Sequence, residues 1–336
     1  MLLIVKVILK VSGGGSITYS RGDLYLDSIS VNNNQFEKTG MVVVAPNTVT
    51  ITGSSENWNK ITGESYSSST MKGVFYANRN VTLSPYAIGK YEVTQELYES
   101  VMDSNPSTEK GETRPVETLS WFDIILFCNN LTEKTLGIQN CVYYTDESFT
   151  TPYNDTSIET VYIDISKCGY RLPTEAEWEF AARGGDTSAD EWFYAFAGTN
   201  SYNDNPLYDT SKKGSTNTYY EYDTSGYLIT DANLDYYAVY SGNSSGITNV
   251  GTKTSNTLGL YDMSGNVYEF VNDNLNTITT GDVTDPITSN NTSSRVIRGG
   301  AYDSYYGAYA CCVTYRKSLS NTSDDTGFRL CRSIVQ

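Results

Sequence analysis

Short apolar runs separated by polar residues fill the first part of the chain. Leu24, Leu26 and Ile29 recur at close spacing, and apolar stretches follow at Met41–Ala45 and Val49–Ile51. Runs of this length, bounded by Asn, Ser, Thr and Gly, are typical of β-strands. We therefore predict that the N-terminal part of the chain contributes several short strands.

The opening segment Leu2–Val11 is apolar, but it contains two lysines and is far shorter than the roughly 20 residues that span a bilayer. We predict a strand here, because neither a small-residue cleavage site nor a lipidation cysteine follows. We expect residues 1–39 to be a strand-rich N-terminal extension and residues 40–336 to be the main domain. Direct membrane insertion by this chain is not expected, and an export signal or lipid anchor would lie in a segment absent from it.

Helical spacing with recognisable start signals appears three times. Thr94 precedes the segment QELYESVM, and Ser120 precedes a run in which apolar residues recur at helical intervals from Trp121 to Leu131. Thr174 and Glu177 have the spacing of a capping box. These patterns predict three helices, which begin just after Thr94, Ser120 and Thr174.

The second half of the chain is more polar. Residues 198–256 are rich in Asn, Tyr, Ser, Thr, Asp and Gly, which predicts a long functional or mobile loop. Compact turn and strand patterns return at Leu258–Phe270, Val296–Arg298 and Gly327–Leu330. We expect these last segments to pair near the C-terminus.

Composition limits the classes of function and partner that the chain can have. With 39% hydrophobic residues the chain can bury a sizeable core, while its surface residues are Asn, Ser and Thr more than Lys and Glu, which favours an extracellular protein. A net charge of -16 argues against nucleic acid and anionic membranes as partners. The chain has no histidine, which removes the commonest general base and metal ligand. None of the six cysteines has CxxC spacing, and Cys128 lies in a helical apolar pattern typical of a buried free thiol.

An ordered series of motifs carries a resemblance to a known family. The motifs are Tyr86–Thr94 (YAIGKYEVT), Arg114–Val116 (RPV), Ser120–Trp121, Tyr170–Glu179 (YRLPTEAEWE), Gly259–Val267 (GLYDMSGNV), Arg298–Gly300 (RGG) and Gly327–Leu330 (GFRL). Together they resemble the formylglycine-generating-enzyme, or sulfatase-modifying-factor, domain over about residues 40–333. The resemblance implies an α+β class and an elaborated C-type lectin-like fold of short strands and helices with long loops.

The chain departs from this family where the enzymes carry out chemistry. The family's oxidases hold copper with a pair of C-terminal thiols, and registration on Arg298–Gly300 places those positions near Ser304 and Tyr309. Copper(I) prefers thiolate ligands, and the successive side chains of Cys311 and Cys312 would point to opposite faces of an extended chain. The iron-dependent branch of the fold uses histidine ligands, which this chain lacks. We expect no enzyme activity and no required cofactor.

Residues 301–320, the variable segment, have the composition of a binding surface. Tyr gives rigid contact area, and Ser, Gly and Asn give adaptable hydrogen bonds. The segment resembles those of the variable proteins of diversity-generating retroelements, most closely the treponemal ones. Mutagenesis of asparagine codons at their first two bases can give every residue from Ala301 to Thr326 except Lys317. The predicted ligand-binding residues are Tyr302, Asp303, Ser304, Tyr305, Tyr306, Tyr309, Ala310, Ser318, Leu319 and Ser320.

A structural calcium ion is also implied by the family, near the turn from Ser264 to Glu269. Asn266 and Glu269 would supply side-chain oxygens of the kind that calcium prefers. The alternative is a turn in which Asn266 adopts left-handed geometry and Glu269 faces solvent or caps backbone amides. Both alternatives stay open at the level of sequence.

These observations favour a non-catalytic, receptor-like protein at the cell surface or outside the cell. Its partner would be an unidentified protein or cell-surface ligand bound by the tyrosine-rich segment. Two alternatives remain: a formylglycine-generating copper oxidase that acts on protein cysteine, and a structural module of a surface assembly.

Overall fold

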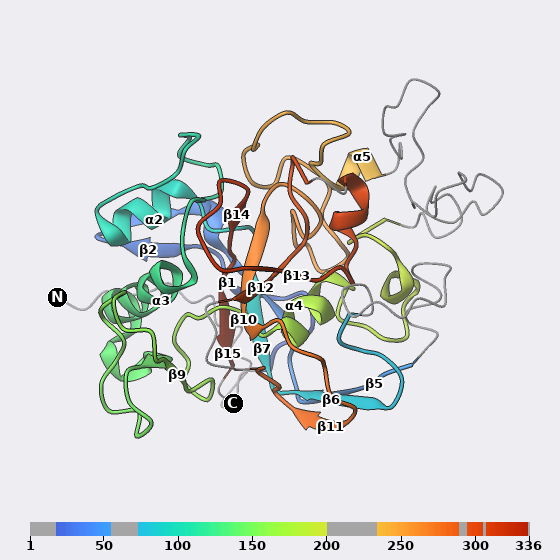
Figure 1. The fold of residues 1–336 in the computed structure, drawn as a ribbon, viewed down its shortest axis with the longest axis horizontal. Coiled ribbons are helices and arrows are strands. Elements are labelled where there is room, and N and C mark those ends of the chain that lie inside the picture. The colour runs from blue at the N-terminus through green and yellow to red at the C-terminus, as the bar shows by residue number, and fades with distance from the viewer. Residues whose placement is uncertain (1–17, 55–72, 200–233, 289–293, 305–306, 335–336) are drawn as a thin grey trace.

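The computed structural model describes residues 18–54, 73–199, 234–288, 294–304 and 307–334, and its ribbon is shown in Figure 1. The chain forms both short strands and short helices, largely in separate stretches, which confirms the predicted α+β class. The helices are α2 (Gln95–Met102), α3 (Trp121–Leu136), α4 (Glu175–Ala182) and α5 (Leu234–Tyr237), with 3-10 turns η1 (Glu37–Thr39), η2 (Ile138–Asn140), η3 (Asp190–Phe193) and η6 (Gly307–Cys311). The strands are β1 (Leu24–Leu26), β2 (Ile29–Val31), β3 (Asn34–Phe36), β4 (Met41–Ala45), β5 (Val49–Thr52), β6 (Arg79–Leu83), β7 (Tyr86–Gly89), β8 (Tyr143–Tyr144), β9 (Tyr162–Ile163), β10 (Tyr268–Asn274), β11 (Gly281–Thr284), β12 (Arg295–Arg298), β13 (Lys317–Leu319), β14 (Thr326–Gly327) and β15 (Cys331–Ser333).

Two four-stranded sheets organise the described residues. One has the order β1-β4-β7-β15, and the other has the order β13-β12-β10-β14. In the second sheet β10 pairs antiparallel with β12 and parallel with β14, so the expected pairing of the C-terminal segments is confirmed. Strand β13 pairs only with β12 and forms an edge of this sheet.

The N-terminal strands are integrated with the rest of the fold. Strand β1 pairs with β4, with Leu24 opposite Val42, and β4 continues the pairing to β7. The predicted strands at Met41–Ala45 and Val49–Ile51 are present as β4 and β5. The strand predicted at Leu2–Val11 lies outside the described residues, and the division of the chain at residue 39 stays a prediction.

All three predicted helix starts are confirmed. The Thr94 side chain accepts from the Leu97 amide at the start of α2. Ser120 with Asp123, and Thr174 with Glu177, form complete capping boxes at α3 and α4. Each box satisfies backbone N–H groups that a helix N-terminus leaves without partners.

Helix α4 lies at the centre of the molecule, and each of its eight residues is buried. Burial on every side requires that its acidic side chains be paired. Trp178 donates its indole N–H to the Glu269 Oε2 atom of β10 at 2.7 Å. The carboxylates of Glu175 and Glu179 point to arginines from the C-terminal part of the chain, and these pairs hold the candidate site in place.

Candidate ligand-binding face

A buried ionic frame fixes the chain at two points, Arg298 before the variable segment and Arg316 near its end. At the start, Arg298 donates to Glu175 at 2.7 Å, to Glu179 at 2.9 Å and to the Val313 carbonyl at 2.5 Å. At the other end, Arg316 donates from Nε and Nη2 to the two oxygens of Glu175 at 2.6 and 2.7 Å. Glu175 therefore joins strand β12 to the residues that lead into β13.

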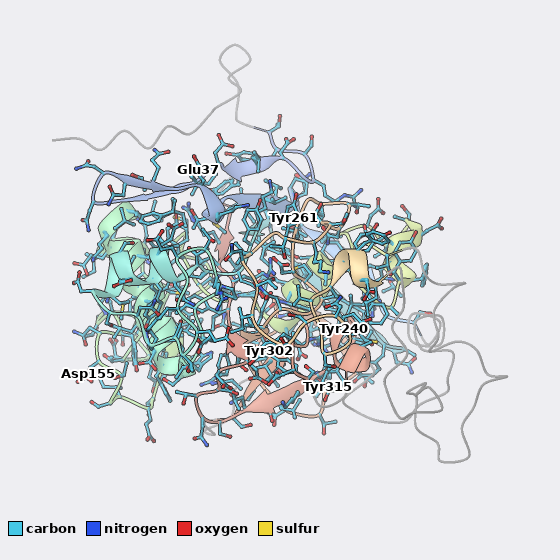
Figure 2. The ribbon with its side chains drawn as sticks, turned by 90° about the horizontal axis from the view of Figure 1, so that it is seen from above. Glu37, Asp155, Tyr240, Tyr261, Tyr302 and Tyr315 are labelled. Carbon is cyan, nitrogen blue, oxygen red and sulfur yellow. The ribbon has the colours of Figure 1, made fainter. Side chains whose placement is uncertain are left out.

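Exposed side chains project from this frame. Asp303 is exposed and Tyr302 is half-buried, and the Tyr302 amide donates to the Asn266 carbonyl at 2.9 Å. Tyr302 is labelled in Figure 2, well away from Asp155 at the far end of the molecule. These two residues form one part of the predicted surface.

Strand β13 supplies the second part. Ser318 and Leu319 are half-buried, Ser320 is exposed, and Ser318 pairs with Val296 of β12. Tyr305 and Tyr306 lie outside the described residues, as does the side chain of Tyr309. The described surface that we call the binding face comprises Tyr302, Asp303, Ser318, Leu319 and Ser320.

Two predicted positions do not belong to that surface. Ser304 is 4% exposed; its hydroxyl accepts from the Ala301 amide at 2.8 Å and donates to the Tyr268 hydroxyl at 3.0 Å. Ala310 is fully buried. The structure therefore does not support direct ligand contact by either residue, because each lies in the packed interior beneath the exposed residues.

The electrostatics of the binding face are acidic. Burial, together with the charges of Asp303 and Asp324, raises the pKa of Tyr302 to about 12. Burial and the neighbouring Asp325 also raise the pKa of Asp303. The ammonium group of Lys317 lies 4.6 Å from the centre of the Tyr268 ring. Negative charge thus surrounds an aromatic group on this side of the molecule.

The neighbouring thiols are sealed within the core. Cys311 and Cys312 are buried, with at most 1% exposure. Burial raises the pKa of Cys311 to about 12 and that of Cys312 further still. A Cβ atom at Gly300, which has a φ of +77°, would lie 2.7 Å from the Cys311 sulfur, so the backbone packs directly on this thiol. Cys128 is also buried and free, as predicted.

The two predicted calcium ligands already have protein partners. Both Glu269 oxygens accept from Arg329, at 2.6 and 2.5 Å, so a positive charge neutralises this carboxylate. The Asn266 side chain donates to Glu92 at 2.6 Å and accepts from the Thr248 amide at 3.0 Å. These contacts do not fit a calcium site built from Asn266 and Glu269, and calcium binding itself stays untested. The expected left-handed geometry of Asn266 is confirmed by its φ of +64°.

The contacts of Asn266 reveal residues that the sequence did not indicate. Glu92, Asp262, Glu269 and Arg329 form a buried group, which we call the acidic cluster, next to the residue that supports Tyr302. Glu92 and Asn266 are 174 positions apart. The motifs around them are visible in the sequence, but no local spacing indicates that their side chains meet.

Among the described residues, no helix combines the length and the apolar character needed to cross a bilayer.

Comparison with known proteins identifies a family and proteins of similar fold. The family model described as "Sulfatase-modifying factor enzyme 1-like domain" matches residues 27–334. Among solved structures, Treponema denticola variable protein 1 is 28% identical with a TM-score of 0.63, and the match covers 91% of this chain and 98% of that one. PvdO from Pseudomonas aeruginosa, at 18% identity and a TM-score of 0.57 over 94% of this chain and 100% of its own, supports the fold alone.

A curated relative matches a shorter stretch. "Chaperone protein LppX" of Paenibacillus barcinonensis is 36% identical over 200 residues, which is 58% of this chain. The match spans 64% of that relative's length.

Proposed function

The chain belongs to the sulfatase-modifying factor enzyme 1-like domain family, and on that premise we propose that it is a non-catalytic, surface-displayed protein that binds ligands through its variable segment. Family membership by itself does not determine activity. The likeness to Treponema denticola variable protein 1 supports a variable surface protein, since it extends over 91% of the chain. The segment from about 301 to 320 is diversified by a retroelement in this proposal.

One observation carries the proposal: a single segment combines a rigid frame with exposed side chains. Glu175 holds Arg298 and Arg316 by ionic hydrogen bonds of 2.6 to 2.7 Å, while Asp303 between them and Ser320 beyond them are exposed. A binding site benefits from this combination, because a fixed backbone reduces the entropy lost on binding. Side chains on such a frame can change without changing the fold.

The residues at and near the family's catalytic positions support a binding role. Near the place of the first thiol lies Ser304, whose hydroxyl is buried and engaged by Ala301 and Tyr268. A hydroxyl is a hard ligand that does not suit copper(I). Cys311 and Cys312 are buried with raised pKa values, so thiolates do not form readily there. Binding in this proposal needs no cofactor.

The partner is a protein or another cell-surface ligand. The net charge of -16 and the aspartates around Tyr302 disfavour nucleic acid. A location at the cell surface or outside the cell agrees with the polar surface rich in Asn, Ser and Thr.

A pair of displayed libraries tests the proposal. One randomises Tyr302, Asp303, Ser318, Leu319 and Ser320; the matched control randomises the exposed residues 154–157 on a remote surface. Both are selected against the same soluble protein, for example lysozyme. We expect folded binders from the first library alone; equal recovery from both, or none from the first, would contradict the proposal.

Diversification and catalysis have separate tests. Sequencing the locus in several isolates should show substitutions concentrated at residues 301–320 and a nearby template repeat, whereas identical copies would favour a structural module. Incubation with a cysteine-containing sulfatase peptide, copper(I) and oxygen should give no formylglycine by mass spectrometry. Detectable turnover would support the oxidase alternative instead.

A further inference from the structure

The acidic cluster beneath the Tyr302 turn holds more negative charge than its one arginine balances. Glu92, Asp262 and Glu269 are at most 2% exposed, and Arg329 is fully buried. Arg329 donates hydrogen bonds from Nε and Nη2 to the two carboxylate oxygens of Glu269, at 2.6 and 2.5 Å. Two buried carboxylates therefore share the remaining influence of a single guanidinium, which is unfavourable unless a proton is also bound.

The hydrogen bonds indicate which carboxylate would hold that proton. Glu92 accepts from Asn266 at 2.6 Å and from the Val267 amide at 3.2 Å, so both of its oxygens have donors. Asp262 accepts from the Gly251 amide at 2.6 Å through Oδ2, whereas its buried Oδ1 has no hydrogen-bond partner in the described part of the chain. Burial raises the pKa of Glu92 well above its usual range in spite of these donors, and it raises the pKa of Asp262 to about 6. Asp262, with its free Oδ1, is therefore the carboxylate that takes up a proton as the solution becomes mildly acidic.

The same cluster supports the binding face. Asp262 fixes Gly251, and Asn266 fixes Thr248 through its side chain, so both ends of residues 248–251 are held by the cluster. The Asn266 carbonyl accepts the Tyr302 amide at 2.9 Å. Repulsion within the cluster would therefore act on two connected segments, residues 248–251 and the turn that begins at Tyr302.

We propose that Asp262 takes up a proton as the solution becomes mildly acidic, and that this proton tightens residues 248–251 and the base of the Tyr302 turn. The charged groups that face Asp262 are Glu269, which favours protonation, and Arg329 and Lys38, which oppose it. Glu92 and Tyr91 also face Asp262, and its charge raises the pKa of each. Burial raises the pKa of Asp262 to about 6, against the opposing effect of the Gly251 amide. Because the folded-state pKa is raised, the stabilisation is complete below the unfolded value of 3.8 and is lost as pH rises through about 6.

Amide hydrogen exchange of the full chain at pH 5.0 and 7.5, corrected for intrinsic rates, tests whether protonation of Asp262 has this effect. We expect protection at Gly251, Thr248 and Tyr302 to fall by about tenfold at the higher pH, as a shift of roughly two pKa units predicts. Asp262→Asn should remove the dependence, since Asn tolerates the φ of +57° and can still accept from Gly251. Asp273→Asn is the matched control, because Asp273 is another buried aspartate with a pKa raised to about 6, and it contacts α4 instead.

Two outcomes would overturn the proposal: an unchanged pH dependence in Asp262→Asn, or a loss of the local dependence in Asp273→Asn. Titration of the Asp262 carboxyl carbon by NMR in the unmodified protein gives an answer even where the variant fails to fold. A midpoint near 6 supports the device, and a midpoint below about 4.5 refutes it. The measurement uses no ligand, so it is independent of the proposed binding function.

Discussion

Replacing Glu175 by Gln should destabilise the frame of the binding face more than any change at an exposed position. The Glu175 carboxylate is 2% exposed and accepts three short hydrogen bonds from Arg298 and Arg316. Gln keeps the shape of the side chain but removes its charge. Arg298 retains Glu179 at 2.9 Å, whereas the ion pair of Arg316 with Glu175 is lost.

The magnitude follows from the burial of all three groups. Removal of one partner from a buried ion pair costs about 3 to 5 kcal/mol, because the other charge stays desolvated. A small domain is stable by only about 5 to 15 kcal/mol, so Glu175→Gln should lose a large share of the total. We expect the loss to extend to residues 299–315, because Glu175 joins Arg298 and Arg316 on either side of that stretch.

Urea unfolding, followed by tryptophan fluorescence, measures this cost. Glu109→Gln is the matched control, since Glu109 forms a 2.8 Å ion pair with Arg114 in which the side chains are 40% and 32% exposed. An exposed pair of this kind contributes about 1 kcal/mol or less. If the two variants were equally stable, the buried frame would not determine the stability of the segment and the reasoning would be wrong.

Three further predictions concern the same region. Ser304→Ala should lower the free energy of unfolding by about 1 to 3 kcal/mol, because it removes the hydrogen-bond partner of two buried groups. Asp303→Ala should change it by about 0.5 kcal/mol or less, and denaturant melts of both variants compare the two effects. Iodoacetamide at pH 8 should modify Cys168, which is partly exposed, and should leave the five buried cysteines unmodified. Labelling in denaturant, where all six thiols should react, is the control. Rapid labelling of any buried thiol in the native protein would contradict the prediction. Asp273, whose pKa burial raises to about 6, should stabilise the fold below pH 4 and lose this contribution as pH rises through 6, so Asp273→Asn should flatten a pH series of melting temperatures.

The sequence predicts those features whose causes are local. Thr174 with Glu177 and Ser120 with Asp123 form their capping boxes within one helical turn, so the spacing of residue types is sufficient to locate α3 and α4. The family motifs predict the α+β fold because they occur in order along most of the chain.

The accessibility of individual residues in the candidate site could not be predicted in this way. Ser304 follows the exposed Asp303 in the sequence, but it is buried because its hydroxyl reaches Tyr268, 36 residues earlier. In the same way, Glu92 meets Asn266 only through tertiary folding. Composition indicates a binding surface, whereas the distinction between its exposed and buried members depends on contacts between distant segments.

The burial of Ser304 and Ala310 limits how many different surfaces the segment can present. The number of variants multiplies with each position that is free to change, so every position committed to the interior divides the accessible repertoire. In return, a larger fraction of the variants folds, because mutations at the remaining positions leave the interior intact. A lineage that diversifies this segment therefore gains more from a smaller set of exposed positions than from mutating every residue in it.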